Sequence, residues 1–248
     1  MYENYVFDLY GTLVDIHTDE SDEKVWEKLS LFYGYYGAHY SPEELEATYH
    51  AMIENREKTQ KSEMEAEPRY AHEAFPEIRI EQVFQELFAR RGVQADSELS
   101  MHAGQFFRVL STEYVRLYEG VPEMLAGIRA MGKKIYLLSN AQRIFTEYEL
   151  NVLDIAKYFD GILISSEYGT KKPDIRFFTI LLETYHLDPK QCIMIGNDAK
   201  SDIAGAQAAE MDTYYIHSNI SPECKEAPKA TFCQMEMDIA KVCKNLKI

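Results

Sequence analysis

The sequence is short of positive charge. Its 248 residues include 26 Lys and Arg against 41 Asp and Glu, which gives a formal net charge of −15 at pH 7. Such an excess of negative charge repels a polyanion, and no cluster of Lys and Arg interleaved with aromatic residues offsets it locally. We therefore expect no nucleic-acid partner.

Long apolar runs and closely spaced cysteines are also missing. No run approaches the roughly 18 apolar residues of a membrane span, and the first residues, MYENYVFDLYG, do not resemble a secretion signal. We predict a cytoplasmic protein without membrane contact. The cysteines, at positions 192, 224, 233 and 243, are too far apart for a CxxC motif, so reduced thiols are expected.

What is present is the composition of an ordinary globular protein. Hydrophobic residues make up 46% of the chain and charged residues 27%. Short apolar runs alternate with helical patterns, and this alternation predicts an α/β fold with a parallel sheet wrapped by helices. The runs are at residues 5–7, 135–138, 162–164, 193–195 and 214–216, and the clearest helices at 122–131, 174–185 and 202–209.

Between residues 16 and 118 the pattern is different. The segment has helical periodicity and almost no β-branched runs, and Ser41-Pro42-Glu43-Glu44 supplies an N-cap, a first-turn proline and a capping-box glutamate. Residues 80–89 and 105–117 give two more amphipathic helices. We predict an all-helical insertion at 16–118. The core then consists of residues 1–15 and 119–248.

Polar residues follow the apolar runs, at the carboxyl ends of the predicted strands, where ligands bind in open parallel sheets. Three of them, Asp8, Asp198 and Asp202, are acids that would repel one another, and a hard divalent cation such as Mg²⁺ is the simplest neutraliser. The others in this set are Tyr10, Gly11, Thr12, Ser139, Asn140, Lys172 and Asn197.

This set suits phosphoryl transfer. A phosphoryl group would sit between Mg²⁺, Lys172 and the hydroxyls of Thr12 and Ser139. Asp8 would attack phosphorus and form an aspartyl-phosphate.

Four motifs, each following a predicted strand or preceding a helix, occur in one order along the chain: FDLYGTLVD, LLSNA, KKPD and IGNDAKSD. In this the sequence resembles the haloacid dehalogenase superfamily over essentially its whole length, with a helical cap inserted after the first motif. The resemblance implies a doubly wound, Rossmann-like core and a cap that closes over the site.

The resemblance also implies roles for the residues that match the motifs. Asp8 is the nucleophile, and Lys172 holds the charge of the nucleophile and the intermediate. The transferred group is bound by Gly11, Thr12, Ser139, Asn140 and Lys172.

The same resemblance implies a metal site. In metal-dependent members the ligands fall at positions occupied here by Asp8, by the main-chain carbonyl of Tyr10 and by Asp198. Asp202 is a direct ligand or a neighbour of the metal.

Tyr10 stands where the family's phosphatases carry the aspartate that acts as general acid and base. A phenol, with a reference pKa of about 10, is a poor base at neutral pH. Tyrosine in a D-x-Y-G-T-L run is typical of the family's 2-haloacid dehalogenases, which displace halide from carbon without a metal. The first motif therefore favours dehalogenation.

The remaining motifs favour a metal. Dehalogenases usually have an SSNxxD-like fourth motif and a tyrosine six residues after the third-motif lysine, whereas this chain has Asp198 beside Asp202 and Phe178. We predict a Mg²⁺-dependent phosphatase acting on a small phosphorylated metabolite. The alternatives are a metal-free dehalogenase in which Asp8 attacks carbon, and a slow or inactive member that binds a phosphorylated ligand.

If Tyr10 is not the base, another group must activate water in the second step. The acids that follow the first motif are a hypothesis for this role: Asp15, Asp19, Glu20, Asp22 and Glu23. Neither the substrate nor the oligomeric state is indicated by the sequence.

Overall fold

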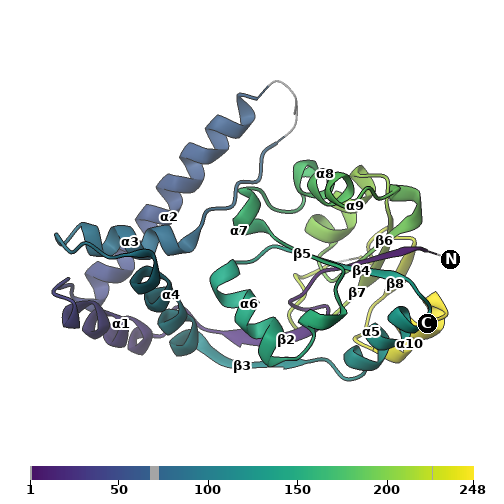
Figure 1. Cartoon of the computed structure of the whole chain (residues 1–248), viewed down its shortest axis with the longest axis horizontal. Coiled ribbons are helices and arrows are strands. Elements are labelled where there is room, and N and C mark those ends of the chain that lie inside the picture. The colour runs from purple at the N-terminus through teal and green to yellow at the C-terminus, as the bar shows by residue number, and fades with distance from the viewer. Residues whose placement is uncertain (1, 68–72, 225) are drawn as a thin grey trace.

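A computed structural model describes residues 2–67, 73–224 and 226–248, and it places a sheet core beside a unit of helices (Figure 1). The main sheet has the order β5-β4-β1-β6-β7-β8, and all of its strand pairs are parallel. The predicted doubly wound α/β fold is confirmed. Its strands are β1 (Asn4–Phe7), β4 (Lys134–Ser139), β5 (Gly161–Ile164), β6 (Cys192–Gly196), β7 (Asp212–Ile216) and β8 (Phe232–Gln234).

The central strand β1 is buried along its whole length, because helices cover both faces of the sheet. Tyr5 and Phe7 pack on one face with α5 (Val121–Ala130) and α10 (Ile239–Leu246), while Val6 packs on the other with α8 (Ile175–Thr184). The larger core helices are α5 (Val121–Ala130), α6 (Arg143–Val152), α8 (Ile175–Thr184) and α10 (Ile239–Leu246). The shorter ones are η1 (Ala156–Tyr158), α7 (Ser165–Tyr168), η2 (Pro189–Gln191), η3 (Ala199–Ala204) and α9 (Gly205–Ala208).

The order of the strands fixes where a ligand can bind. β1 lies between β4 and β6, so the chain winds away from β1 in both directions. The carboxyl ends of strands at such a switch point leave a crevice between the loops. The first, second and fourth motifs follow β1, β4 and β6 and therefore meet there.

The helical unit consists of α1 (Glu23–Tyr35), α2 (Pro42–Glu65), α3 (Ile80–Ala89) and α4 (Ser97–Ser111). Side-chain N-caps start three of these helices, from Asp22, Ser41 and Asp96. The unit has its own hydrophobic core, built around aromatic residues such as Trp26 and Phe84. Within the described part of the chain, no helix is long and apolar enough to span a bilayer.

One predicted helix is partly wrong. The helix expected over 105–117 ends at Ser111, and β3 (Thr112–Leu117) pairs antiparallel with β2 (Val14–Thr18). Both ends of the segment expected to be wholly helical are thus strands. The sequence TEYVRL is rich in β-branched and aromatic residues, but its partner strand lies about a hundred residues earlier and is invisible to local periodicity.

Candidate active site

Asp8 follows β1 and lies in the crevice, with its side chain almost fully buried. Its main-chain N–H donates to the carbonyl of Ile195 on β6, at 3.0 Å, which continues the sheet pairing by one residue. Its Oδ1 accepts a hydrogen bond from Lys172 Nζ at 2.7 Å. Among the described residues, its Oδ2 has only a long contact, 3.5 Å, to the Thr12 hydroxyl, which leaves this oxygen the better placed of the two to react.

Lys172 lies between two carboxylates. Its Nζ is 2.7 Å from Asp8 Oδ1 and 2.7 Å from Asp202 Oδ1, and its side chain is 1% exposed. Burial alone would lower the pKa of Lys172, but the attraction of Asp202 and Asp8 outweighs it and raises the pKa. The lysine therefore stays charged. Asn140 fixes its backbone by donating to the Lys172 carbonyl and accepting from the Lys172 N–H, both at 2.8 Å.

Asp202 lies in η3, the short π-helix after β6, and Asp198 is the residue that precedes it. Asp202 Oδ2 accepts from the N–H of Asp198 at 2.9 Å, and Asp198 caps the turn through the N–H groups of Lys200 and Ser201. Burial raises the pKa of Asp202, while Lys172 opposes the rise. A Cβ on Gly196 would lie 2.3 Å from Asp202 Cγ, so this place in β6 requires glycine.

Two hydroxyls and a glycine turn complete the crevice. The Thr12 hydroxyl is 3.3 Å from Asn197 Oδ1, and Gly11 has φ +85°, with room for a Cβ excluded by Asn197 Nδ2 at 2.2 Å. Ser139 ends β4, and its buried Oγ has no hydrogen-bond partner among the described residues. A buried hydroxyl without a partner costs stability, which is expected where a ligand supplies the missing bond.

The donor set fits a hard divalent cation. Asp8, Asp198 and Asp202 bring three carboxyl groups together with the single cation of Lys172, and each ligand would be an oxygen. Both Asp202 oxygens already accept hydrogen bonds, from Lys172 and from Asp198 N–H. Asp8, Asp198 and the Tyr10 carbonyl therefore remain the better donors. Within the described ranges, no group of three or more His, Cys, Asp or Glu side chains has metal-holding geometry by itself.

The Tyr10 phenol is engaged on α6. Its OH donates to Glu149 Oε2 at 2.5 Å and lies 3.0 Å from the Thr146 hydroxyl. Burial, and then the charge of Glu149, raise the pKa of Tyr10. Among the residues that the structure describes, no hydrogen bond joins this phenol to Asp8.

Glu149 and Arg108 are site neighbours that the sequence did not reveal. The Arg108 guanidinium, from α4 of the helical unit, bonds Glu149 at 2.8 Å and lies 5.8 Å from the centre of the Tyr10 ring. Side-chain exposure is 17% for Arg108 and 7% for Glu149, so the pair is largely shielded from water. Tyr10, Arg108 and Glu149 come from the first-motif loop, α4 and α6, and no local sequence pattern connects them.

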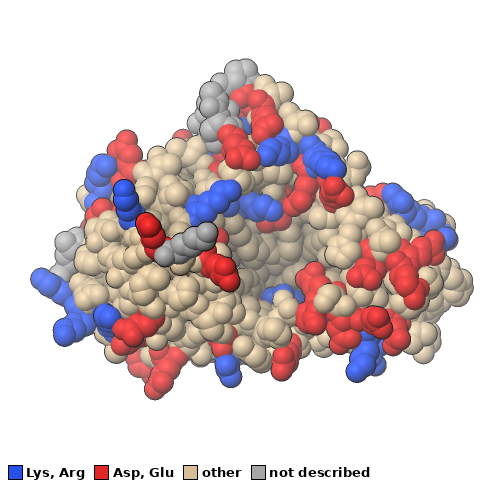
Figure 2. Space-filling view, turned by 180° about the vertical axis from the view of Figure 1, so that it is seen from behind, with Lys and Arg blue, Asp and Glu red and all other residues tan. Residues whose placement is uncertain are grey.

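The acids after the first motif are mostly engaged elsewhere. Asp15 accepts from Arg116 and Asn219, Asp19 binds Ser21, and Asp22 caps α1. Burial raises the pKa of Glu20, and the charge of Arg108 opposes this rise. On the face drawn in Figure 2, the surface is hollowed between the sheet core and the helical unit.

The chain was compared with known proteins. A family model of the haloacid dehalogenase-like hydrolases matches residues 2–210. Phosphoserine phosphatase from Thermus thermophilus is 29% identical over 147 residues, 59% of this chain and 58% of that protein. Glyceraldehyde 3-phosphate phosphatase from Methanothermobacter thermautotrophicus is 29% identical over 107 residues, 43% and 47% of the two chains. The chain thus spans about half the length of the curated relatives it matches.

A solved structure of 2-haloacid dehalogenase from Pseudomonas syringae pv. Tomato has a TM-score of 0.60 at 20% identity, over 100% of this chain and 99% of that one. This likeness shows a shared fold. With the family model matching most of the chain, and with Asp8, Ser139, Lys172 and Asp202 in one crevice, the chain belongs to the haloacid dehalogenase-like hydrolases.

Proposed function

We propose that this hydrolase is a Mg²⁺-dependent phosphatase that acts on a small phosphorylated metabolite. The observation that carries the proposal is the excess of acids in the crevice, where Asp8 and Asp202 share Lys172 and Asp198 lies next to Asp202. A cation between Asp8, Asp198 and the Tyr10 carbonyl would neutralise the excess and polarise a phosphoryl oxygen. The phosphatase names of the two curated relatives agree with this chemistry.

The residues supply a nucleophile and a binding frame. Asp8 Oδ2 attacks phosphorus, a new O–P bond forms to Asp8, and the substrate's ester O–P bond breaks. The leaving oxygen departs with the bond's electron pair and takes a proton. Lys172 stays charged and, with the hydroxyls of Thr12 and Ser139, stabilises the transferring group. Water then cleaves the aspartyl-phosphate, which releases phosphate and restores Asp8.

Further contacts to the transferred group are proposed from the loop backbones. Gly11 turns the first-motif loop, with its own N–H donating to the Val14 carbonyl at 2.7 Å, so that the loop can approach the transferred group. Asn140 holds the second motif in place, and its main-chain N–H would bind a phosphoryl oxygen. In this scheme Tyr10 contributes its carbonyl, and its phenol has a structural role on α6. The proton for the leaving group then comes from solvent or from the substrate itself.

We also propose that the insertion at 16–118 acts as a cap on a core of 1–15 and 119–248. A cap over the crevice would exclude water from the covalent intermediate and admit a small substrate.

Dehalogenation is the second candidate, and Tyr10 in the D-x-Y-G-T-L run is the observation that favours it. In that reaction Asp8 would displace halide from carbon without a metal. Phe178 is fully buried against Gly205, and it offers no hydroxyl at the place where dehalogenases carry a tyrosine.

The test is hydrolysis of p-nitrophenyl phosphate with Mg²⁺ and with EDTA, beside halide release from 2-chloropropionate, with Asp8→Asn as the blank. Phosphate release that needs Mg²⁺ and disappears in Asp8→Asn supports the proposal. Halide release that persists in EDTA would replace it with dehalogenation. If the protein turns over neither of these compounds and none of a panel of phosphorylated metabolites, it is a ligand-binding member.

A further inference from the structure

The segment that joins α2 to α3 lies directly on the loop that carries Lys172. We call residues 73–80 of this segment the strap. It runs antiparallel to residues 169–171, and it uses its main chain for the hydrogen bonds to this loop. The contacts are Lys171 N–H to the Phe75 carbonyl at 2.9 Å, Glu77 N–H to the Gly169 carbonyl at 3.2 Å, Phe75 N–H to Asp174 Oδ2 at 3.0 Å and a bridge between Pro76 and Thr170.

The Glu77 side chain extends these contacts to a second loop. Its Oε1 accepts from Gln142 Nε2 and its Oε2 from the Ser165 hydroxyl, both at 3.0 Å. The same Ser165 oxygen accepts the N–H of Ala141 at 2.9 Å. Ala141 follows Ser139 and Asn140, so Glu77 is one residue removed from the loop of the second motif.

Gln142 fastens the strap from the other side. Its amide donates to the carbonyl of Ile78 and accepts from the N–H of Ile80, both at 3.0 Å. The strap is therefore held at Phe75, at Glu77 and at Ile80, by loops that carry the second and third motifs. Detaching the helical unit at this place would break all of these bonds.

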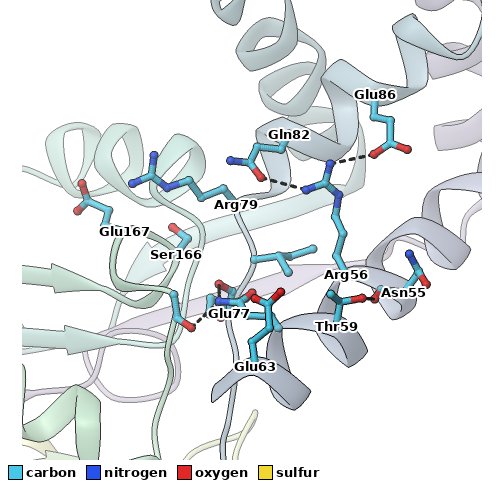
Figure 3. Close-up of a pocket in the computed structure, with 13 residues that line it drawn as sticks. Asn55, Arg56, Thr59, Glu63, Glu77, Arg79, Gln82, Glu86, Ser166 and Glu167 are labelled. Carbon is cyan, nitrogen blue, oxygen red and sulfur yellow. Dashed lines mark hydrogen bonds and ion pairs between the residues drawn. The ribbon is translucent and has the colours of Figure 1, made fainter. Parts of the chain in front are cut away.

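Burial of the Glu77 carboxylate is energetically unfavourable. The residue is 9% exposed, and burial raises the pKa of its carboxyl, while Lys171, 4.0 Å away, opposes the rise. In Figure 3 it lies at the base of a pocket of about 700 Å³, between Ser166 of the core and Thr59 of α2. Burying a carboxylate is unfavourable unless hydrogen bonds compensate it, and here Gln142 and Ser165 supply these bonds.

We propose that Glu77 is a positioning residue of the active site, because it ties the strap to both loops and makes the placement of Ser139 and Lys172 depend on docking of the helical unit. Lys172 passes this dependence to the nucleophile, since its Nζ bonds Asp8 and its backbone is held by Asn140. The consequence for turnover rests on the proposed phosphatase function, whereas the placement itself does not.

The experiment uses the full chain with Glu77→Ala, Glu77→Gln and Gln142→Ala. Glu63→Gln is the matched control, because Glu63 lines the same pocket but is exposed. Hydrogen–deuterium exchange is followed in peptides covering 139–142 and 169–172, and thermal melting confirms folding. We expect exchange there to rise about tenfold in Glu77→Ala and Gln142→Ala, as for loss of a hydrogen bond to a charged group, and less in Glu77→Gln.

Kinetics with p-nitrophenyl phosphate supply a second readout. Loss of a positioning contact of this kind lowers activity about 10–100-fold, and we expect it in kcat with a smaller change in KM, partly restored in Glu77→Gln. Exchange in Glu77→Ala equal to that in Glu63→Gln would overturn the proposal. If the wild type hydrolyses no phosphate ester, the exchange result still decides the positioning role, and only the proposed function fails.

Discussion

Removing the Tyr10 hydroxyl distinguishes a structural role of this phenol from a role as general acid or base. Tyr10→Phe deletes the 2.5 Å bond to Glu149 and the 3.0 Å contact to Thr146, but leaves Glu149 paired with Arg108 at 2.8 Å. A hydrogen bond to a charged group contributes about 1.5–3 kcal/mol, so we expect the free energy of unfolding to fall by that amount. In a chain of this size the fall corresponds to about 3–12 °C in Tm.

The effect on turnover is expected to be small. Losing a general acid or base lowers kcat about 10²–10⁴-fold, whereas a phenol that only supports the first motif is expected to cost less than about tenfold. The assay is urea denaturation together with kcat on p-nitrophenyl phosphate at saturating Mg²⁺. Tyr148→Phe is the control, since Tyr148 lies on α6 next to Glu149 and is 65% exposed. A hundredfold loss of kcat with unchanged stability would refute this assignment and make the phenol a catalytic group.

Four further outcomes are expected. The difference in free energy of unfolding between wild type and Tyr10→Phe should stay constant up to about pH 10 and become smaller above it. The pKa of Tyr10 is raised in the folded state, so above about pH 10 the tyrosine ionises first in the unfolded state and thereby favours unfolding. Denaturation at pH 8 and 10.5 checks this. Ser139→Ala should keep or raise Tm, because its buried hydroxyl has no partner among the described residues, and should raise KM for the phosphate ester; an unchanged KM would contradict it. Gly196→Ala should displace Asp202 and lower kcat by at least about tenfold, unlike Gly34→Ala, whose nearest contact would be an ordinary 3.7 Å. Arg108→Met should destabilise by about 3–5 kcal/mol by leaving Glu149 buried without its cation, and Arg108→Met with Glu149→Leu should recover part of this in calorimetry.

The fold was readable because its signals are local. Each buried parallel strand leaves a short apolar run, and α5 and α8 begin and end within one residue of the predicted helices at 122–131 and 174–185. The strands β2 and β3 were missed because their stability comes from pairing with each other across the whole helical unit. The edge strand β8 was missed for a different reason, because it is only three residues long.

The candidate site divides in the same way. Asp8, Ser139 and Asp202 were predictable as neighbours, because carboxyl ends of adjacent parallel strands meet. The contact between Tyr10 and Glu149 joins residues 139 positions apart, and the bond between Ser165 and Glu77 spans 88 positions. The first contact depends on how α6 packs beside the first-motif loop, and the second on how the helical unit sits on the core. Hydrophobic periodicity reports neither.

The two sets of contacts between the helical unit and the core meet on one helix. Gln142, Thr146 and Glu149 are spaced four and three residues apart, so they share a face of α6. Gln142 binds the strap, Glu149 binds Arg108 of α4, and Thr146 joins them by donating to the Gln142 carbonyl and contacting the Tyr10 phenol.

α6 follows the second motif directly, so movement of the helical unit should reach the first and second motifs together. If so, Glu77→Ala and Tyr10→Phe act on one unit, and their effects on the free energy of unfolding should not add. We expect the double variant to differ from the sum of the single variants by about 0.5–3 kcal/mol in urea denaturation. Pairing Tyr10→Phe with Glu63→Gln supplies an additive reference. Strict additivity in both pairs would mean that the strap and the Tyr10 contacts hold the core independently, and that α6 does not connect them.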